Sequence, residues 1–418
     1  MHFYFIGIKG TGMSALANIL SDLGYEVSGV DYNKKYFTEA TFRKNIKVET
    51  FENYFLKEDY FYIVGNAFKI AEITEKIKES NFKYQYYSEF IEDFFKMPKI
   101  GVCGSHGKTT TTSFASQLIS EKINYLVGDG TGGGDKEAKY FLFEACEYQN
   151  NFLKYTYEYL VVLNIDYDHP DFFKNSSDYT FSFIKAALQA NIVIVNYDDL
   201  NCRKIVHQNK ITFGFNPLSD IVLKLIDNKL IIKIEDVCYE LEFNFHGKHM
   251  AYNLGAAFII SYLVSNDVDK LIKRVLNLKL PLRRFYEQKI KNDVILISDY
   301  AHHPTEIKAF ISSARSKYPN YKLIIVYQGH THSRTSTFLS EYIESLKEAD
   351  EVYIMPTFSS VREEECNFYE LLENENGFKE YKTFSVEWLL DSSNLIIGFL
   401  GAGDIYNEFI FLNKKVNY

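Results

Sequence analysis

The chain has 418 residues and a formal net charge of −9, because 55 acidic side chains outnumber 46 basic ones. The acidic balance excludes a general binder of nucleic acid or of anionic membranes, since such a protein needs a clustered basic excess. Apolar residues at 46% and charged residues at 24% exclude a disordered chain, and the length predicts two or three domains.

The cysteines and the N-terminus predict where the protein works. Five cysteines are odd in number and never in C-x-x-C spacing, which indicates neither a disulfide framework nor a zinc site. The first residues carry no basic region before their apolar stretch, which is interrupted by Lys9, so they do not resemble a signal peptide. No run of about 18 apolar residues predicts a membrane span. We therefore expect a reduced, cytoplasmic protein that binds neither nucleic acid nor membrane and is a monomer or a homodimer.

The first segment predicts a Rossmann-like unit. An apolar strand over residues 3–8 leads into Gly10-Thr11-Gly12, an amphipathic helix follows, and a second strand ends at Asp31. A third strand ends at Gly65-Asn66-Ala67. The glycine pattern is GxxGxG and not GxGxxG, so it does not favour a nicotinamide cofactor. Amides at a helix N-terminus can still bind a pyrophosphate; a buried turn without a ligand is the alternative.

The most specific local motif follows a short strand over residues 100–103 and reads Gly104-Ser105-His106-Gly107-Lys108-Thr109-Thr110. It departs from the strict P-loop because Val102 stands where GxxxxGK[ST] has its first glycine. The chemistry is the same: glycines let backbone amides surround phosphates, a lysine neutralises their oxygens, and a threonine hydroxyl is available to Mg²⁺. A coincidental glycine turn is the alternative interpretation.

Two further strands end in possible metal ligands. A strand over residues 140–143 ends at Glu144, and one over 160–165 leads to Asp166, Asp168 and His169. Carboxylate and hydroxyl oxygens are the ligands that Mg²⁺ prefers. Alone, the Asp-His-Pro-Asp stretch is more typical of a solvated turn, but after a phosphate loop it favours a nucleotide site. Residues 211–241 alternate and predict peripheral antiparallel strands.

A last unit, from about residue 281, predicts a second doubly wound α/β arrangement. A strand over residues 294–297 ends at Asp299, a helix covers 307–318, and a strand over 323–327 leads to His330. These polar residues fall at strand C-termini, where such folds place their sites. A metal site formed by the nearby histidines is the alternative.

Taken together, these motifs resemble the Mur ligases, and their order covers nearly the whole chain. The segments that carry the resemblance are residues 7–14, 104–109, 144–148, 164–171, 283–285 and 299–306. The histidine before Gly-Lys-Thr and the Asp-Tyr-Ala-His-His-Pro stretch are similar to one branch, which joins L-alanine to UDP-N-acetylmuramate in Gram-positive-type bacteria. Gly329 stands where this family usually has proline.

The resemblance implies three α/β domains: a Rossmann-like UDP-substrate-binding domain over residues 1–97, a central P-loop ATP-binding domain over 98–280, and a Rossmann-like ligase domain over 281–418. It also implies an activity in cytoplasmic peptidoglycan precursor synthesis, with ATP and Mg²⁺ as cofactors. ATP would phosphorylate the lactyl carboxylate of UDP-N-acetylmuramate, and the amine of L-alanine would attack the acyl phosphate.

Individual roles follow from the matching motifs. Binding of ATP is implied for Gly104, Ser105, His106, Gly107, Lys108, Thr109, Thr110, Asn253, Arg284 and Asp299. Binding of the UDP-substrate is implied for Gly10, Thr11, Gly12, Met13, Ser14, Asp31, Asn66 and Ala67. The implied Mg²⁺ ligands are Thr109, Glu144 and His169, and the implied catalytic residues are Lys108, His302, His330 and Arg334.

Two other functions compete with this interpretation. A ligase that recycles a murein tripeptide onto the same UDP-sugar shares most of these motifs and differs in its amine pocket. A regulatory relative would bind nucleotide without turnover, although such a protein has no physical need of Lys108, Thr109, Glu144 and His169 together. A dehydrogenase is disfavoured by the glycine pattern and by the separate phosphate loop.

Overall fold

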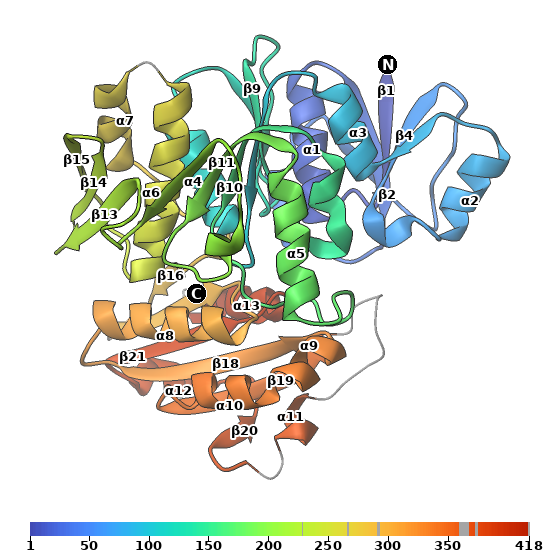
Figure 1. The fold of residues 1–418 in the computed structure, drawn as a ribbon. Helices are drawn as coiled ribbons and strands as arrows, with labels where there is room; N and C mark the ends of the chain where they lie inside the picture. Colours follow the sequence, from blue (N-terminus) through green and yellow to red (C-terminus); the bar gives the residue numbers. More distant parts are fainter. Residues whose placement is uncertain (228, 266, 291–292, 359–367, 373–374, 417–418) are drawn as a thin grey trace. The chain divides into compact units, whose positions relative to one another are not determined.

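The computed structural model describes residues 1–227, 229–265, 267–290, 293–358, 368–372 and 375–416. Its strands form three sheets (Figure 1). The chain divides into two compact units. The first comprises residues 1–167, 175–244 and 251–279, and the second comprises residues 168–174, 245–250 and 280–418.

The first sheet is parallel throughout, in the order β3-β2-β1-β4-β5. Phe3 of β1 packs edge-on against Phe90 and Phe94 of α3, whereas Tyr4 shares a core cluster with Ile73 of α2. Helices therefore cover both faces, which explains why β1 is apolar at successive positions. The elements are β1 (His2–Ile6), α1 (Thr11–Asp22), β2 (Glu26–Asp31), β3 (Lys47–Thr50), β4 (Tyr60–Val64), α2 (Glu72–Glu79), β5 (Tyr84–Tyr86) and α3 (Tyr87–Phe94).

The second sheet has ten strands in the order β15-β14-β13-β12-β11-β10-β6-β9-β7-β8. Its strands are β6 (Lys99–Cys103), β7 (Ile123–Leu126), β8 (Gly132–Gly133), β9 (Tyr140–Glu144), β10 (Tyr157–Val162), β11 (Ala190–Asn196), β12 (Lys210–Gly214), β13 (Ile221–Ile226), β14 (Lys229–Ile234) and β15 (Val237–Glu242). Its helices are α4 (Lys108–Leu118), α5 (Ser176–Ala187), α6 (Lys248–Val264) and α7 (Val268–Val275).

Two sequence predictions about this sheet were wrong in detail. β12 pairs parallel with both β11 and β13, and within the predicted region the antiparallel pairs are β13 with β14 and β14 with β15. The reason is that β12 extends the parallel part of the sheet, and the antiparallel part begins only where β14 pairs with β13. The strand predicted over 160–165 ends at Val162, because the Asn164 side chain next bonds to the loop after β6.

A glycine-rich segment, residues 128–134, packs against α1 within the first unit. A Cβ atom on Gly132 would overlap the carbonyl oxygen of Ala15, so this close approach of two backbones requires glycine. The Gly130 carbonyl accepts hydrogen bonds from Asn18 Nδ2 at 3.3 Å and from Thr41 Oγ1 at 3.0 Å. The segment thereby joins the first sheet to the second.

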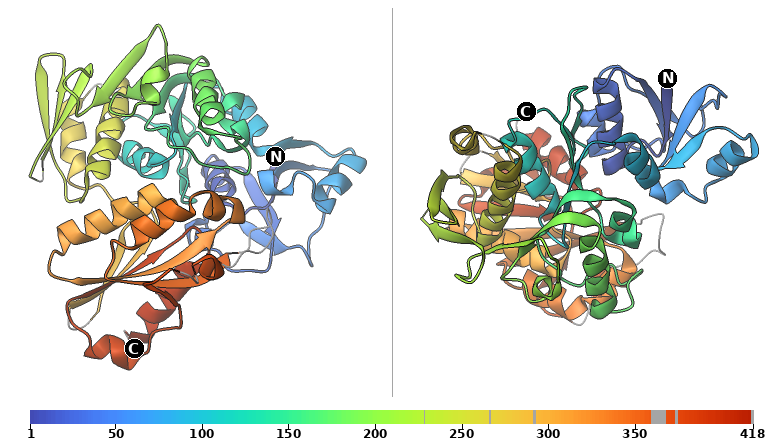
Figure 2. Two further views of the ribbon diagram at one scale, coloured as in Figure 1. Left: turned by 60° about the horizontal axis from the view of Figure 1, so that its bottom comes forward. Right: turned by 45° about the horizontal axis from the view of Figure 1, so that its top comes forward.

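The sheet of the second unit has the order β16-β17-β21-β18-β19-β20 and is parallel except for β16. Helices lie on both of its faces (Figure 2), as the predicted doubly wound unit requires. The elements are β16 (Tyr286–Lys289), β17 (Val294–Asp299), α8 (Pro304–Lys317), β18 (Lys322–His330), α9 (His332–Thr337), α10 (Leu339–Leu346), β19 (Glu351–Phe358), α11 (Phe368–Leu371), β20 (Phe378–Glu380), α12 (Val386–Asp391), β21 (Leu395–Leu400) and α13 (Ile405–Val416).

Among the described residues, no helix combines the length and the apolar character that crossing a bilayer requires.

The packing of the glycine-rich segment on α1 predicts that a larger residue at position 132 destabilises the protein. Gly132→Ala should lower the free energy of unfolding by about 1–3 kcal/mol, because the added methyl group forces two backbones apart. Gly10→Ala is the control: its nearest neighbour would lie 3.5 Å away and its φ of −60° suits alanine. Urea unfolding of both variants measures the difference, and equal stability of the two would contradict the packing.

Candidate active site

The loop between β6 and α4 depends on two glycines in the left-handed half of conformational space. Gly104 has φ +141° and Gly107, the N-cap of α4, has φ +85°. A Cβ atom on Gly107 would overlap Asn253 Oδ1, and one on Gly104 would lie 3.0 Å from Leu163 Cβ. Both positions therefore require glycine, and the loop directs its backbone towards the first turn of α4, as a phosphate-binding loop does.

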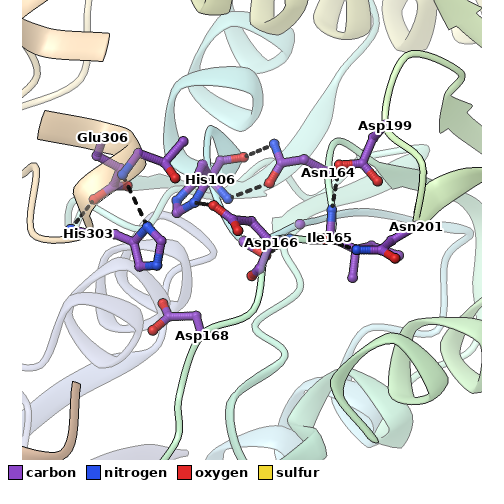
Figure 3. Close-up of polar contacts among 12 residues, drawn as sticks. His106, Asn164, Ile165, Asp166, Asp168, Asp199, Asn201, His303 and Glu306 are labelled. Atoms are coloured by element: carbon purple, nitrogen blue, oxygen red, sulfur yellow. Dashed lines mark hydrogen bonds and ion pairs between the residues drawn. The ribbon is translucent and has the colours of Figure 1, made fainter. Parts of the chain in front are cut away.

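The same loop is held to the end of β10 by a pair of polar residues (Figure 3). Asn164 Oδ1 accepts a hydrogen bond from His106 N at 2.8 Å, and Asn164 Nδ2 donates to His106 O at 3.0 Å. His106 Nε2 also lies 2.9 Å from Asp166 Oδ2. His106 is thus fixed through its backbone and its ring.

Lys108 begins α4 and points back into the loop. Its ammonium donates to the carbonyl oxygens of Gly104 at 2.5 Å and Ser105 at 3.1 Å, and lies 2.9 and 3.1 Å from the two carboxylate oxygens of Glu147. Burial is the largest single influence and opposes the charged form of Lys108, but the surrounding acidic groups, Glu147 foremost, together raise the pKa of Lys108 above its ordinary value. The lysine is therefore a cation within the loop.

Tyr179, in the first turn of α5, contacts both the loop and Glu147. Its hydroxyl lies 2.9 Å from Ser105 Oγ and 3.4 Å from Glu147 Oε1, and all three residues are buried. Ser105 Oγ donates a hydrogen bond to Asp166 O at 2.6 Å and accepts one from Asp166 N at 2.9 Å.

The side chains of Thr109 and Glu144 come together at the C-terminal ends of β6 and β9. Thr109 Oγ1 donates to Glu144 Oε2 at 2.8 Å. A Cβ atom on Gly128 would overlap this carboxylate and lie 2.9 Å from Thr109 Oγ1, so glycine at this position keeps a side chain away from both oxygens. A hydroxyl and a carboxylate this close together are the kind of oxygen ligands that suit a Mg²⁺ ion.

The third predicted Mg²⁺ ligand lies in the other unit. His169 has φ +56° and belongs to residues 168–174, which pack with the second unit. Its backbone amide donates to Asp168 Oδ1 at 2.7 Å.

The residues predicted to bind the UDP-substrate gather at the C-terminal edge of the first sheet. Gly10 is the N-cap of α1, and the Ser14 hydroxyl donates to Thr11 O at 3.0 Å in the first turn. Gly12 approaches Tyr87, since a Cβ atom there would lie 2.7 Å from its hydroxyl. The helix N-terminus presents backbone amides suited to a pyrophosphate.

Asp31 is buried at the end of β2, and its carboxylate accepts hydrogen bonds from the backbone. It accepts the amides of Lys9 and Tyr32, each at 2.8 Å. Burial raises the pKa of Asp31, and these two hydrogen bonds oppose that rise. Asn66 and Ala67 follow β4 in a short 3₁₀ turn at the same sheet edge.

In the second unit, Asp299 ends β17 and Arg284 lies near it. The Asp299 carboxylate accepts the amides of Phe285 at 2.7 Å and Ala301 at 2.8 Å. Burial raises the pKa of Asp299, and the Arg284 guanidinium opposes this shift. Arg284 itself lies 3.8 Å from Glu306 Oε1 and over the ring of Tyr300.

The predicted catalytic residues of this unit lie near the ends of β17 and β18. The ring centroids of His302 and His330 are 6.4 Å apart. Burial lowers the pKa of His302 to about 4, so its ring is neutral at pH 7. Arg334 forms a buried bidentate pair with Asp168, at 2.8 and 3.2 Å.

Sequence reasoning missed four residues that organise these sites: Glu147, Asn164, Tyr179 and Glu306. Glu306 caps α8 and accepts the amide of His302 at 3.0 Å. Glu147 lies three residues after Glu144, and Asn164 is among the first residues after β10. Their positions just beyond strand ends could therefore have indicated these two residues. Nothing local indicates that Tyr179 reaches the loop.

Comparison with known families decides the identification. Residues 2–98 match the model of the Mur ligase family catalytic domain, residues 102–261 match the Mur ligase middle domain, and residues 283–386 match the Mur ligase glutamate ligase domain. The chain belongs to the Mur ligase family. Mur ligases are ATP-dependent, ADP-forming enzymes of peptidoglycan synthesis, and the predicted fold class of three α/β domains is confirmed.

Solved structures of other Mur ligases share this fold. The UDP-N-acetylmuramate-alanine ligase MurC of Thermotoga maritima is 21% identical with a TM-score of 0.80, covering 100% of this chain and 99% of that one. The murein peptide ligase of Psychrobacter arcticus is 18% identical with a TM-score of 0.71, covering 99% and 98%. The MurF ligase of Thermotoga maritima, solved in complex with ADP, is 16% identical with a TM-score of 0.62, covering 93% and 95%.

The attachment of the loop to β10 predicts a loss of nucleotide affinity. Asn164→Ala removes both hydrogen bonds to His106, so we expect the Kd for ATP to rise about tenfold. Asn201→Ala is the matched control, because its Nδ2 donates to Ile165 O at 2.8 Å at the same strand end (Figure 3). Calorimetric titration with ATP measures both variants. An equal change in the two would contradict a specific role for Asn164.

Proposed function

We propose that this Mur ligase joins L-alanine to the lactyl carboxylate of UDP-N-acetylmuramate, with conversion of ATP to ADP and phosphate, in cytoplasmic peptidoglycan precursor synthesis. The observation that carries the proposal is the loop over residues 104–110, with Lys108 and the Thr109–Glu144 pair at one sheet edge. We further propose the domain division 1–97, 98–280 and 281–418.

The chemistry explains why such a loop is needed. A carboxylate is a poor electrophile, and its attack on the γ-phosphorus of ATP brings two anions together. The loop amides after Gly104 would orient the phosphates, and the Lys108 ammonium would stabilise the charge that develops on the transferring phosphoryl group. The carboxylate oxygen then bonds to phosphorus, and ADP leaves.

The Mg²⁺ ion implied by the family fits beside Thr109 and Glu144, whose oxygens lie 2.8 Å apart. When bound, it would neutralise phosphate charge. We propose His169 as a further ligand. Glycine at position 128 keeps a side chain from covering these two oxygens.

The UDP-substrate would bind at the C-terminal edge of the first sheet. The amides of residues 10–14 would hold its pyrophosphate at the α1 N-terminus, with Asp31 and Asn66-Ala67 at its borders. Asp31 already accepts two backbone amides, which fixes the conformation of the loop after β1. A further hydrogen bond from a substrate hydroxyl would use its remaining acceptor capacity.

The amine would be received in the second unit. Its attack on the acyl phosphate forms the amide and expels phosphate. The pKa of about 4 makes His302 a weak base at pH 7, so we assign it hydrogen bonding to substrate instead of proton removal. His330 and Arg334 would complete this pocket, while Asn253, Arg284 and Asp299 would hold the adenosine part of ATP.

The amino-acid substrate is inferred from sequence motifs. The histidine at position 106 and the Asp-Tyr-Ala-His-His-Pro stretch over residues 299–304 favour the L-alanine-adding branch. A ligase for a whole murein tripeptide would keep the same phosphate loop and the same UDP-sugar, and would differ in the pocket for the amine.

Phosphate release separates these functions. The purified enzyme would be incubated with ATP, Mg²⁺ and UDP-N-acetylmuramate, and with L-alanine, the murein tripeptide or no amine. We expect release only with L-alanine. Release that depends on the tripeptide would assign the recycling reaction, and no release with either amine would contradict a synthetic ligase and favour a regulatory nucleotide-binding protein.

A further inference from the structure

The phosphate-loop lysine is fully engaged inside the protein. An ammonium carries three N–H donors, and those of Lys108 face two loop carbonyl oxygens and the Glu147 carboxylate. Its side chain is only 12% exposed. A phosphate that binds this ammonium must therefore replace at least one of these partners.

Glu147 is the partner whose release matters most. The residue is 1% exposed, so its carboxylate is removed from water. A buried carboxylate that loses a cation is costly unless another donor approaches. A hydroxyl suited to that task lies nearby, on Tyr179, 3.4 Å from Glu147 Oε1.

The hydrogen-bond directions show that this hydroxyl can turn. Ser105 Oγ uses its single proton to donate to Asp166 O at 2.6 Å, so the proton shared between Ser105 and Tyr179 belongs to the tyrosine. If Tyr179 turns towards Glu147, Ser105 Oγ still accepts the amide of Asp166 at 2.9 Å. The serine therefore keeps a donor.

We propose that Glu147 and Tyr179 are positioning residues that exchange partners when ATP binds. Without nucleotide, Glu147 holds Lys108 and Tyr179 donates to Ser105. With nucleotide, Lys108 moves to the phosphates and Tyr179 donates to Glu147. The exchange deepens the proposed function, and it rests on ATP being the ligand of this loop.

A double-mutant cycle tests the exchange. The probe is Mg²⁺ with adenylyl imidodiphosphate, an ATP analogue that is not hydrolysed, and calorimetry measures its Kd. Glu147→Gln weakens the hold on Lys108 and should lower the Kd about fivefold. Tyr179→Phe removes the replacement donor and should raise the Kd about fivefold in the otherwise native enzyme. In the Glu147→Gln background, the same tyrosine change should alter the Kd by less than about twofold.

Turnover provides a second readout. Tyr179→Phe removes the donor that Glu147 needs when nucleotide binds, so it weakens nucleotide binding. The KM for ATP should therefore rise about fivefold while kcat stays within about twofold. A purely structural role for the tyrosine would lower kcat as well.

Two matched controls lie in the same unit. Glu92→Gln alters a similar pair, in which Glu92 lies 3.2 Å from the buried Lys99 at the opposite end of β6. Tyr157→Phe removes a buried hydroxyl that donates to Phe152 O at 2.6 Å. Neither should change the Kd for the analogue by more than about twofold.

The directions of the Kd changes decide whether Glu147 and Tyr179 exchange partners. Weaker binding of the analogue by Glu147→Gln, or an equal effect of Tyr179→Phe in both backgrounds, would overturn the proposed exchange. Neither result would contradict the proposed ligase function. If the unaltered enzyme does not bind the analogue at all, both the exchange and the proposed function fail.

Discussion

The close contact between the β6–α4 loop and its surroundings is the constraint on which the rest of the site depends. Gly107 adopts φ +85° directly against Asn253, and Gly104 adopts φ +141° against the end of β10. This backbone path starts α4 with Lys108 inside the loop and places Thr109 against Glu144. A side chain at either glycine would displace Lys108 and the Thr109 hydroxyl together.

The glycine-rich segment over residues 128–134 extends this constraint to the first sheet. At one end, Gly128 lies against the Thr109–Glu144 pair, and further along Gly132 lies against the α1 backbone. The N-terminus of the same helix carries the residues proposed to bind the UDP-substrate. Because glycine backbones make both contacts, the proposed nucleotide and UDP sites are joined by tightly packed main chain, which transmits small shifts better than flexible side chains do.

The sequence predicted the parts of the structure that depend on local pattern. Glycine turns, apolar strands and acids at strand ends located the loop at Gly104 and the carboxylate of Glu144 at the end of β9. Tertiary contacts were not predictable: Tyr179 reaches the loop from a helix more than 70 residues later in the chain. The pairing of β12 was missed because alternation alone does not distinguish a parallel from an antiparallel edge. The segment over residues 128–134 attracted no prediction, since its glycines are explained only by the helix that packs against them.

The proposed reaction depends on an acyl phosphate intermediate, and an oxygen label shows whether one forms. UDP-N-acetylmuramate with ¹⁸O in both oxygens of the lactyl carboxylate would be converted with ATP and L-alanine, and the released phosphate analysed by mass spectrometry. Attack of the carboxylate on ATP predicts one ¹⁸O atom in each phosphate formed with amide. Unlabelled phosphate alongside amide product would show that the carboxylate is not activated by phosphorylation and would contradict an acyl phosphate intermediate.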